Sequence, residues 1–132
     1  MKILPAILSL TLLALTGFAQ TQYEINQDAE NSYKKAEQEL NDTYQKILKE
    51  YASDTSFISH LKAAERLWIE FRDAELAMKF PPEPAGSYGS VLPMCESQYM
   101  EQLTRDRIKT LKVWLDGIEE GDVCTGSVKI KQ

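Results

Sequence analysis

Three stretches of the chain repeat apolar residues at helical spacing. In the first, apolar or small residues lie three or four positions apart, with charged residues between them. This spacing places the apolar residues along one side of a helix, and it predicts a helix from about Gln22 to Tyr51. The residues on this stripe are Ala29, Tyr33, Ala36, Leu40, Tyr44, Ile47 and Tyr51.

A second helix is predicted after the polar segment 53–56, whose side chains can accept hydrogen bonds from the free N–H groups of a helix start. Its apolar residues follow a nearly strict heptad, which suits antiparallel packing against a neighbouring helix. Pro81 and Pro82 end this helix near Lys79. The second stripe consists of Phe57, Leu61, Ala64, Trp68, Phe71 and Met78.

The third stretch predicts a helix that begins between Cys95 and Ser97 and loosens near Gly117 or Gly121. The segment from Pro81 to Pro93, before this helix, is the one long irregular part of the chain. Each helix has a single apolar face and is not stable alone. The sequence therefore predicts an all-α fold, a three-helix up-down-up bundle with a long Pro/Gly loop between helices two and three. The third stripe is Met100, Leu103, Arg107, Leu111, Trp114 and Ile118.

The chain begins with the features of a secretory signal. Lys2 precedes an apolar run from Ile3 to Leu15, and small residues follow at Gly17 and Ala19. The run is shorter than the roughly 20 residues that span a membrane. We therefore expect residues 1–19 to be a cleaved signal peptide. The remaining residues, 20–132, should form one secreted or periplasmic domain with no membrane anchor, since 132 residues are too few for a Rossmann or barrel enzyme.

Export changes the interpretation of the two cysteines. In an oxidising compartment an even pair of thiols favours a disulfide, so we expect Cys95 and Cys124 to be bonded. A metal site is the alternative, but two Cys and the distant His60 lack the close ligand spacing of a zinc site.

Composition argues against a nucleic-acid-binding protein and against an enzyme. The chain has 15 Lys and Arg against 20 Asp and Glu, a net charge of −5, whereas a nucleic-acid binder has a basic patch. An acidic chain suits a basic partner, because opposite charge speeds encounter. The sequence contains no zinc-protease, phosphate-loop or calcium-loop motif, and His60 has no nucleophile motif near it. We expect neither catalysis nor a cofactor.

Two arginines have an unusual setting. Trp68 and Arg72 are four residues apart on one helix, so that the guanidinium can lie over the indole. Arg107 falls on the apolar stripe of the third helix, where a charge needs a carboxylate or several carbonyl groups as partners. We interpret these residues as a structural brace between helices two and three and the loop. Direct contact with a ligand is the alternative.

Together these segments resemble the lysozyme inhibitor LprI-like family, whose members are small exported helical proteins. The matching pieces are AEQELNDTY at 36–44, RLWIEFRDAE at 66–75, YGSVLPMC at 88–95 and LTRDRIKTL at 103–111. The order W-x-x-F-R-D, G-S, L-T-x-x-R is specific to the family. Carried over by position, the family pattern falls on Leu40, Asn41, Tyr44, Trp68, Arg72, Asp73, Gly89, Ser90, Leu103, Thr104, Arg107 and Leu111.

The resemblance implies a function and extends the predicted brace. It implies an exported protein that binds a protein partner such as lysozyme and blocks a basic wall-degrading muramidase. In this interpretation Tyr88, Gly89 and Ser90 form the partner-binding loop. The alternative is a structural or stress-related envelope protein that packs against a helical partner along an exposed edge of Tyr33, Tyr44 and Tyr51. The brace consists of Trp68, Arg72, Asp73, Thr104 and Arg107.

The cysteines depart from the family pattern. Many relatives carry one Cys soon after the R-D-A of the second helix and another just before L-T-x-x-R. This chain has Glu75-Leu76 and Ser97-Gln98-Tyr99 at those places. The pair available for a disulfide here is instead Cys95 with Cys124.

Overall fold

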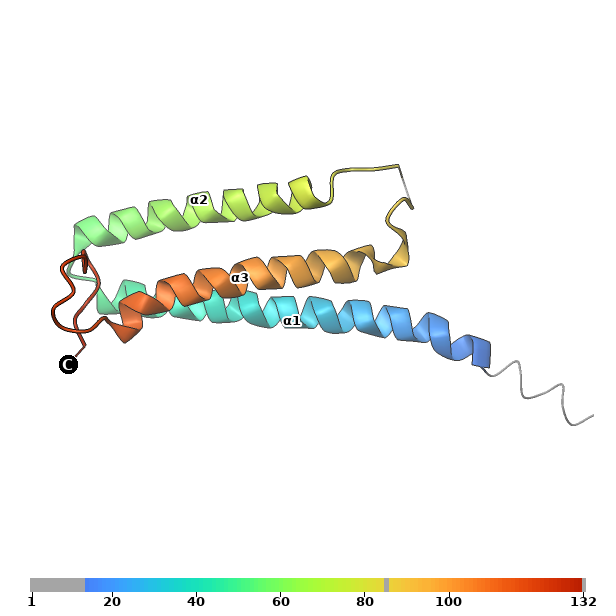
Figure 1. Ribbon diagram of the computed structural model, residues 1–132, viewed down its shortest axis with the longest axis horizontal. Coiled ribbons are helices and arrows are strands. Elements are labelled where there is room, and N and C mark those ends of the chain that lie inside the picture. The colour runs from blue at the N-terminus through green and yellow to red at the C-terminus, as the bar shows by residue number, and fades with distance from the viewer. Residues whose placement is uncertain (1–13, 85, 132) are drawn as a thin grey trace, which may run out of the picture.

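The computed structural model describes residues 14–84 and 86–131 and is all-α, with three long helices and no strand in this part of the chain (Figure 1). The helices are α1 (Ala14–Glu50), α2 (Thr55–Lys79) and α3 (Leu92–Asp116), and a short 3-10 turn, η1 (Gly89–Val91), precedes α3. The predicted fold class and the three predicted helices are confirmed.

The helix boundaries follow local chemistry. Asp54 caps α2, because its side chain accepts a hydrogen bond from the backbone N–H of Phe57 at 2.9 Å. The end of α2 at Lys79 agrees with the prediction. The third helix begins earlier than predicted, at Leu92, because Pro93 lies in its first turn. Proline is tolerated there, since the first N–H groups of a helix have no partner within the helix.

The N-terminal part of the predicted signal segment, residues 1–13, lies outside the described residues. Helix α1 begins at Ala14 and runs through the cleavage point predicted after Ala19. None of the described helices is long and apolar enough to cross a membrane.

The chain reverses direction at each connection, so that α1 and α3 run the same way and α2 runs against both (Figure 1). Helices α1 and α3 lie side by side, whereas α2 stands further from them and shares few contacts with α3. The buried core reflects this arrangement, because only one of its members comes from α2. The core consists of Leu40, Ile47, Leu61, Ile108 and Leu111.

The apolar stripe predicted for the second helix is only partly turned inward, which corrects that prediction. Leu61 is buried and Trp68 half-buried, but Phe71 and Met78 are 58% and 71% exposed. The inward face of α2 includes Glu65 and Arg72 instead. These charged side chains find partners on α1 and α3, and so the helix is rotated away from its most apolar side.

The C-terminal tail is fastened to the end of the bundle. Ile118 and Ile130 form an isolated β-bridge. The Tyr51 hydroxyl donates to the carbonyl of Trp114 at 2.9 Å and accepts from the N–H of Lys129 at 3.2 Å. Gly117 has a φ of 74°, and a Cβ added there would lie 2.9 Å from the Lys129 carbonyl. The tail therefore packs closely against the end of α3.

The predicted disulfide between Cys95 and Cys124 is wrong, because both cysteines are free. Cys95 lies in the first turn of α3, and Cys124 lies beyond its other end. At about 1.5 Å per residue, the intervening helix separates the two by roughly 30 Å. A disulfide requires Cα atoms within about 7 Å. The tail would have to run back along α3 to meet this requirement, but it pairs with Ile118 instead.

Candidate functional site

A buried ion pair joins α2 to α3. The Nε and Nη2 atoms of Arg107 both approach the same Glu65 oxygen, Oε2, at 3.0 and 2.9 Å. The two side chains are only 16% and 11% exposed. A charge on an apolar stripe needs such a partner, since an unpaired charge in this position is costly. Arg107 thus has the carboxylate partner that its setting requires.

A second arginine joins α2 to α1. Nη1 of Arg72 lies 3.4 Å from Oε1 of Glu37, and its Nε and Nη2 donate to the neighbouring Asp73 at 3.0 and 2.9 Å. The same Glu37 oxygen accepts from the Tyr33 hydroxyl at 2.7 Å. The pKa of Tyr33 is raised above its usual value, chiefly by burial and then by this bond to Glu37. Tyr33 therefore remains a neutral donor to the carboxylate.

Trp68 lies between the two arginines. The guanidinium carbon of Arg72 is 5.4 Å from the centre of the indole, and that of Arg107 is 5.7 Å away. Both distances are within the range of a cation–π contact. We call this group from three helices the polar brace, and it consists of Glu37, Glu65, Trp68, Arg72, Asp73 and Arg107.

Thr104, which the sequence placed in the same group, occupies a different environment. It lies one turn before Arg107 on α3 and is fully buried. Among the described residues its hydroxyl has no hydrogen-bond partner. Thr104 is therefore a packed core residue, and it makes none of the polar contacts of the brace.

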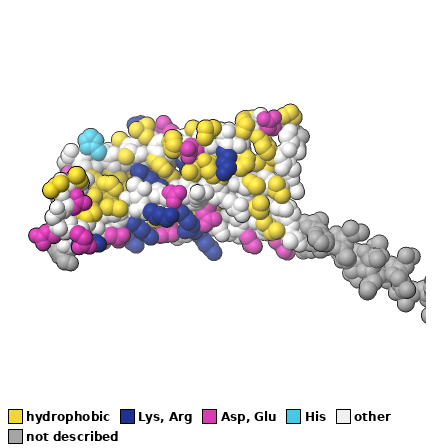
Figure 2. Space-filling model, in the orientation of Figure 1, with side chains coloured by type: hydrophobic (Ala, Val, Ile, Leu, Met, Phe, Trp, Pro, Cys, Tyr) yellow, Lys and Arg dark blue, Asp and Glu magenta, His cyan; other side chains and the backbone are white. Residues whose placement is uncertain are grey.

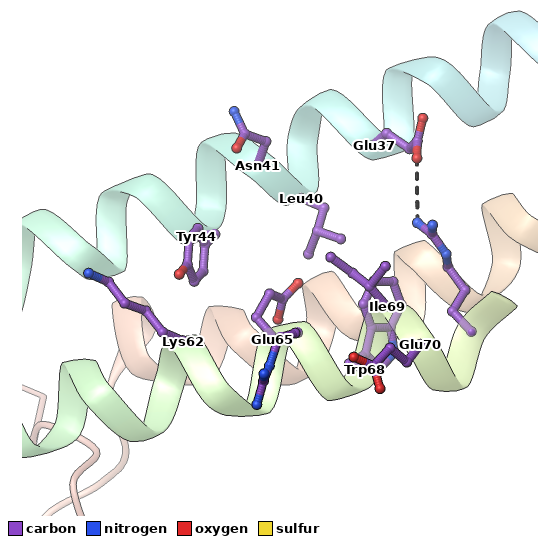
Figure 3. Close-up of a pocket in the computed structure, with 11 residues that line it drawn as sticks. Glu37, Leu40, Asn41, Tyr44, Lys62, Glu65, Trp68, Ile69 and Glu70 are labelled. Carbon is purple, nitrogen blue, oxygen red and sulfur yellow. Dashed lines mark hydrogen bonds and ion pairs between the residues drawn. The ribbon is translucent and has the colours of Figure 1, made fainter. Parts of the chain in front are cut away.

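An amphipathic cleft of about 590 Å³ lies between α1 and α2 beside the brace. Figure 3 shows Leu40 and Tyr44 pointing from α1 toward α2, with Trp68 and Ile69 opposite them. The pair between Glu37 and Arg72 spans the gap near one end (Figure 3). The charged lining has both signs, since it includes Lys62, Arg66 and Glu70 as well as the brace residues. Within the described residues no group of His, Cys, Asp and Glu is placed to hold a metal ion.

The predicted partner-binding loop is held at both ends. At its start, the Tyr88 hydroxyl donates to the Pro81 carbonyl at 2.9 Å, and the Tyr88 ring meets Phe80 edge-on with 6.0 Å between centres. At its end, the side-chain amide of Asn26 on α1 donates to the Ser90 carbonyl at 3.0 Å. Gly89 has a φ of 72°, a backbone conformation that favours glycine. The structure thus brings Tyr88, Gly89 and Ser90 together at one end of the bundle.

Loop and brace are linked through the end of α2. The Lys79 ammonium lies 3.7 Å from the centre of the Tyr99 ring on α3, and Phe80 meets the same ring edge-on at 6.5 Å. Lys79 is the last residue of α2, the helix that carries Trp68 and Arg72, and Phe80 follows it directly. Two successive aromatic contacts, from Tyr99 to Phe80 and from Phe80 to Tyr88, therefore fix where the loop leaves α2.

Three residues of this architecture were missing from the sequence analysis: Glu37, Glu65 and Asn26. Glu65 could have been found, because it lies between Leu61 and Trp68 at spacings of four and three residues. That position places a carboxylate on the same face as an apolar stripe, the pattern that drew attention to Arg107. Glu37 and Asn26 lie on a helix with many exposed polar residues, and nothing local distinguishes them from the others.

Comparison with known proteins gives one family match and one similar curated protein. The model of the family described as "Lysozyme inhibitor LprI" matches residues 16–111, which include the brace and the loop and stop before the C-terminal tail. An uncharacterized protein of Rhizobium meliloti (strain 1021) is 32% identical over 112 residues, covering 76% of this chain and 78% of the relative. No solved structure matches the chain.

Proposed function

The chain belongs to the LprI lysozyme inhibitor family, and from this premise we propose that it is an exported protein that binds and blocks a basic wall-degrading muramidase. The family is one of inhibitors rather than enzymes. Such an inhibitor needs a preorganised surface that fits the enzyme, and no chemistry of its own. The proposal therefore depends on whether the fold offers a rigid element that can enter a cleft.

The observation that carries the proposal is how the loop of Tyr88, Gly89 and Ser90 is held at the end of the bundle. The Tyr88 hydroxyl donates to the Pro81 carbonyl, and the Asn26 amide donates to the Ser90 carbonyl. A loop already held in one shape loses little conformational entropy on binding, which favours affinity.

Ser90 is the candidate donor to the enzyme. It is exposed, and the Asn26 amide donates to its carbonyl oxygen, while its hydroxyl makes no hydrogen bond within the described residues and is left for a new bond. Muramidases use carboxylates in catalysis, and a carboxylate is a strong acceptor for a hydroxyl donor. We propose that Ser90 donates to a catalytic carboxylate of the enzyme.

Charge favours the same partner. With a net charge of −5 the chain attracts a basic enzyme over several ångströms, which raises the association rate at low salt. This attraction selects for the sign of the partner's charge. Specific recognition depends on the loop.

The proposal is tested by measuring muramidase activity with the wild-type protein and with Ser90→Ala. We expect inhibition by the wild type at micromolar concentration and affinity that is at least about tenfold lower for Ser90→Ala, since a hydrogen bond to a charged group contributes about 1.5–3 kcal/mol. Ser59→Ala is the matched control, because Ser59 is an exposed serine near the opposite end of α2. An enzyme that neither loses activity nor binds the wild-type protein at low salt would exclude the proposal.

The alternative, an envelope protein that packs against a helical partner through Tyr33, Tyr44 and Tyr51, has less support. All three tyrosines are half-buried. The hydroxyls of Tyr33 and Tyr51 bond within the chain, to Glu37 and to the Trp114 carbonyl, and Tyr44 packs against the core. The tyrosines on this edge of α1 therefore make most of their contacts within the protein itself.

A further inference from the structure

The cleft between α1 and α2 is bounded at both ends. At one end the pair of Glu37 with Arg72 crosses from helix to helix. At the other, where the chain turns from α1 into α2, the rings of Tyr51 and Phe57 meet with 4.7 Å between centres. The volume of about 590 Å³ is that of a small-molecule site, which typically measures about 300–1,000 Å³.

Glu65 has one carboxylate oxygen left over in this cleft. Its Oε2 accepts both bonds from Arg107, whereas Oε1 has no partner among the described residues. The residue is only 8% exposed, and Figure 3 shows its side chain pointing from α2 toward α1. A mostly buried charged oxygen is stabilised by an N–H or O–H donor. The cleft therefore offers a ligand a fixed acceptor.

The Tyr44 hydroxyl is a second unused polar group. Tyr44 points from α1 toward α2 and is half-buried (Figure 3), and within residues 14–84 and 86–131 its hydroxyl makes no hydrogen bond. Burial, and then the charge of Glu65, raise the pKa of Tyr44 above its usual value. The hydroxyl therefore stays neutral and can donate as well as accept.

The cleft carries no net charge. Its charged lining residues are three acids and three bases, Glu37, Glu65 and Glu70 with Lys62, Arg66 and Arg72. Of these, Lys62, Arg66 and Glu70 make no ion pair in the described part of the chain, so their charged groups are available to a ligand. A charged ligand gains no net attraction here. An uncharged ligand with hydroxyl and amide groups can use donors and acceptors alike.

Apolar side chains form the rest of the cleft. Leu40 on α1 lies opposite Ile69 on α2 (Figure 3), and Ile69 is 42% exposed. Tyr44 and Trp68 add aromatic surface beside them. The side of Figure 2 on which α2 lies likewise mixes hydrophobic and charged side chains. Such a lining suits a ligand that has both C–H surfaces and many polar groups.

Two peptide occupants fit less well. A partner helix needs a groove that is apolar along its length, but six of the eleven lining residues are charged. An extended peptide that adds a strand needs a sheet edge to bond its backbone, and the described part of the chain has no strand.

We propose that the cleft between α1 and α2 binds a short uncharged oligosaccharide that carries N-acetyl groups. An acetamido N–H donates to Oε1 of Glu65, and the adjoining methyl group packs beside Leu40 and Ile69. The ring hydroxyls bond to the Tyr44 hydroxyl and to the unpaired charged groups. The residues of the loop, 88–90, do not line the cleft, so this inference does not rest on the proposed function.

The test titrates the isotope-labelled protein, with no muramidase present, with chitotriose, a trimer of N-acetylglucosamine. We expect saturable shifts of amide signals that gather around Leu40, Tyr44 and Ile69. Cellotriose has similar rings but no acetamido group, and it should bind at least about tenfold more weakly, because it lacks the donor to Glu65. The affinity for chitotriose should change little with salt, since the ligand is uncharged.

Two variants test the lining without disturbing the fold. Tyr44→Phe removes the unbonded hydroxyl and keeps the ring, and Ile69→Gln removes exposed apolar surface without changing charge. Each should weaken binding roughly threefold to tenfold. Tyr23→Phe and Ile25→Gln are the matched controls, because these residues are 65% and 40% exposed and neither lines the cleft. Circular dichroism should be the same for all four variants.

Several results would overturn the inference. Chitotriose that shifts no amide of the cleft at millimolar concentration would exclude the site, and shifts gathered elsewhere would place sugar binding outside it. Equal binding of cellotriose would exclude recognition of the acetamido group by Glu65. Wild-type affinity in both Tyr44→Phe and Ile69→Gln would also contradict the proposal. None of these results bears on muramidase inhibition, which Ser90→Ala tests separately.

Discussion

Arg107 on α3 directs two guanidinium nitrogens, at 3.0 and 2.9 Å, to a single oxygen of Glu65 on α2. This pair is one of few contacts that draw α2 toward the other helices, because α2 contributes only Leu61 to the buried core. Trp68 lies on the same helix as Glu65, and its indole contacts the guanidinium of Arg107. The attachment of α2 therefore depends on polar contacts to an unusual degree.

Replacing Arg107 with Met should destabilise the protein by about 3–5 kcal/mol, because the Glu65 carboxylate would remain in a mostly buried position without its partner. Urea unfolding followed by circular dichroism measures the change. Arg105→Met is the matched control, since Arg105 is 44% exposed and pairs with Glu101 at the surface. The double variant Glu65→Leu/Arg107→Met should regain most of the loss. An unchanged midpoint for Arg107→Met would show that the pair does not hold the helices.

Thr104 should tolerate the loss of its hydroxyl. Its Oγ1 is buried without a partner among the described residues, so Thr104→Val removes an unsatisfied polar atom and keeps the shape of the side chain. We expect stability to be unchanged or higher by up to about 1 kcal/mol. Thr110→Val is the comparison, because the Thr110 hydroxyl donates to the Asp106 carbonyl at 3.1 Å. A clear loss of stability in Thr104→Val would mean that the hydroxyl has a partner.

The two thiols should react independently in the folded protein. Cys124 is exposed and Cys95 half-buried, so an alkylating reagent should modify Cys124 first and Cys95 more slowly. Intact mass spectrometry should find no mass gain on reduction, because no disulfide is present to reduce. Protection of both thiols together, reversed by a reductant, would contradict this arrangement.

Glu39 should contribute to acid sensitivity. The hydrogen bond from Lys112, then the charges of Lys112 and Arg105, lower the pKa of Glu39 below its usual value. A carboxylate with a lowered pKa stabilises the folded state above its unfolded pKa, and this stabilisation is lost as the pH falls through the folded pKa. The side chain is 42% exposed, so the effect amounts to a few tenths of a kcal/mol. Glu39→Gln should make the free energy of unfolding fall slightly less steeply as the pH is lowered, which urea unfolding at a series of pH values measures. If the variant has the same pH dependence as the wild type, the pair of Glu39 with Lys112 does not contribute to acid sensitivity.

The sequence predicted the parts of the fold that depend on local chemistry. Helix periodicity, the capping segment 53–56 and the stop at Pro81 depend on near neighbours, and all three were recognised, although the sequence did not say which of the four side chains caps the helix. The rotation of α2 about its axis could not be predicted. The heptad containing Leu61, Trp68 and Phe71 predicts that this face is turned to the core, whereas the ion pair of Glu65 with Arg107 turns a different face inward. That pair joins residues 42 positions apart.

The candidate site was predicted in the same uneven way. Trp68, Arg72 and Arg107 were recognised because each has an unusual local setting, whereas their carboxylate partners depend on tertiary contacts. The disulfide prediction failed because an even number of cysteines does not say how far apart they lie, and α3 holds Cys95 and Cys124 far apart. The role of Asn26 depends on a contact with Ser90, 64 positions away.

The last prediction separates the two steps of lysozyme binding. Long-range attraction should set the association rate, which should fall with salt because the screening length is about 8 Å at physiological ionic strength. Neutralising Glu119, Glu120 and Asp122 should therefore slow association and leave dissociation nearly unchanged.

Tyr88 should act on the dissociation rate. It packs on Phe80 and bonds the Pro81 carbonyl, so Tyr88→Ala removes an aromatic contact and frees the start of the loop. A contact of this kind contributes about 2 kcal/mol or more, and dissociation should become roughly 30-fold faster with little change in association. Tyr88→Phe keeps the ring and loses only the hydroxyl, so its effect should be smaller. Surface plasmon resonance at low and physiological salt measures both rates. If Tyr88→Ala instead slowed association and left dissociation unchanged, the loop would act before the complex forms and would not hold the complex together.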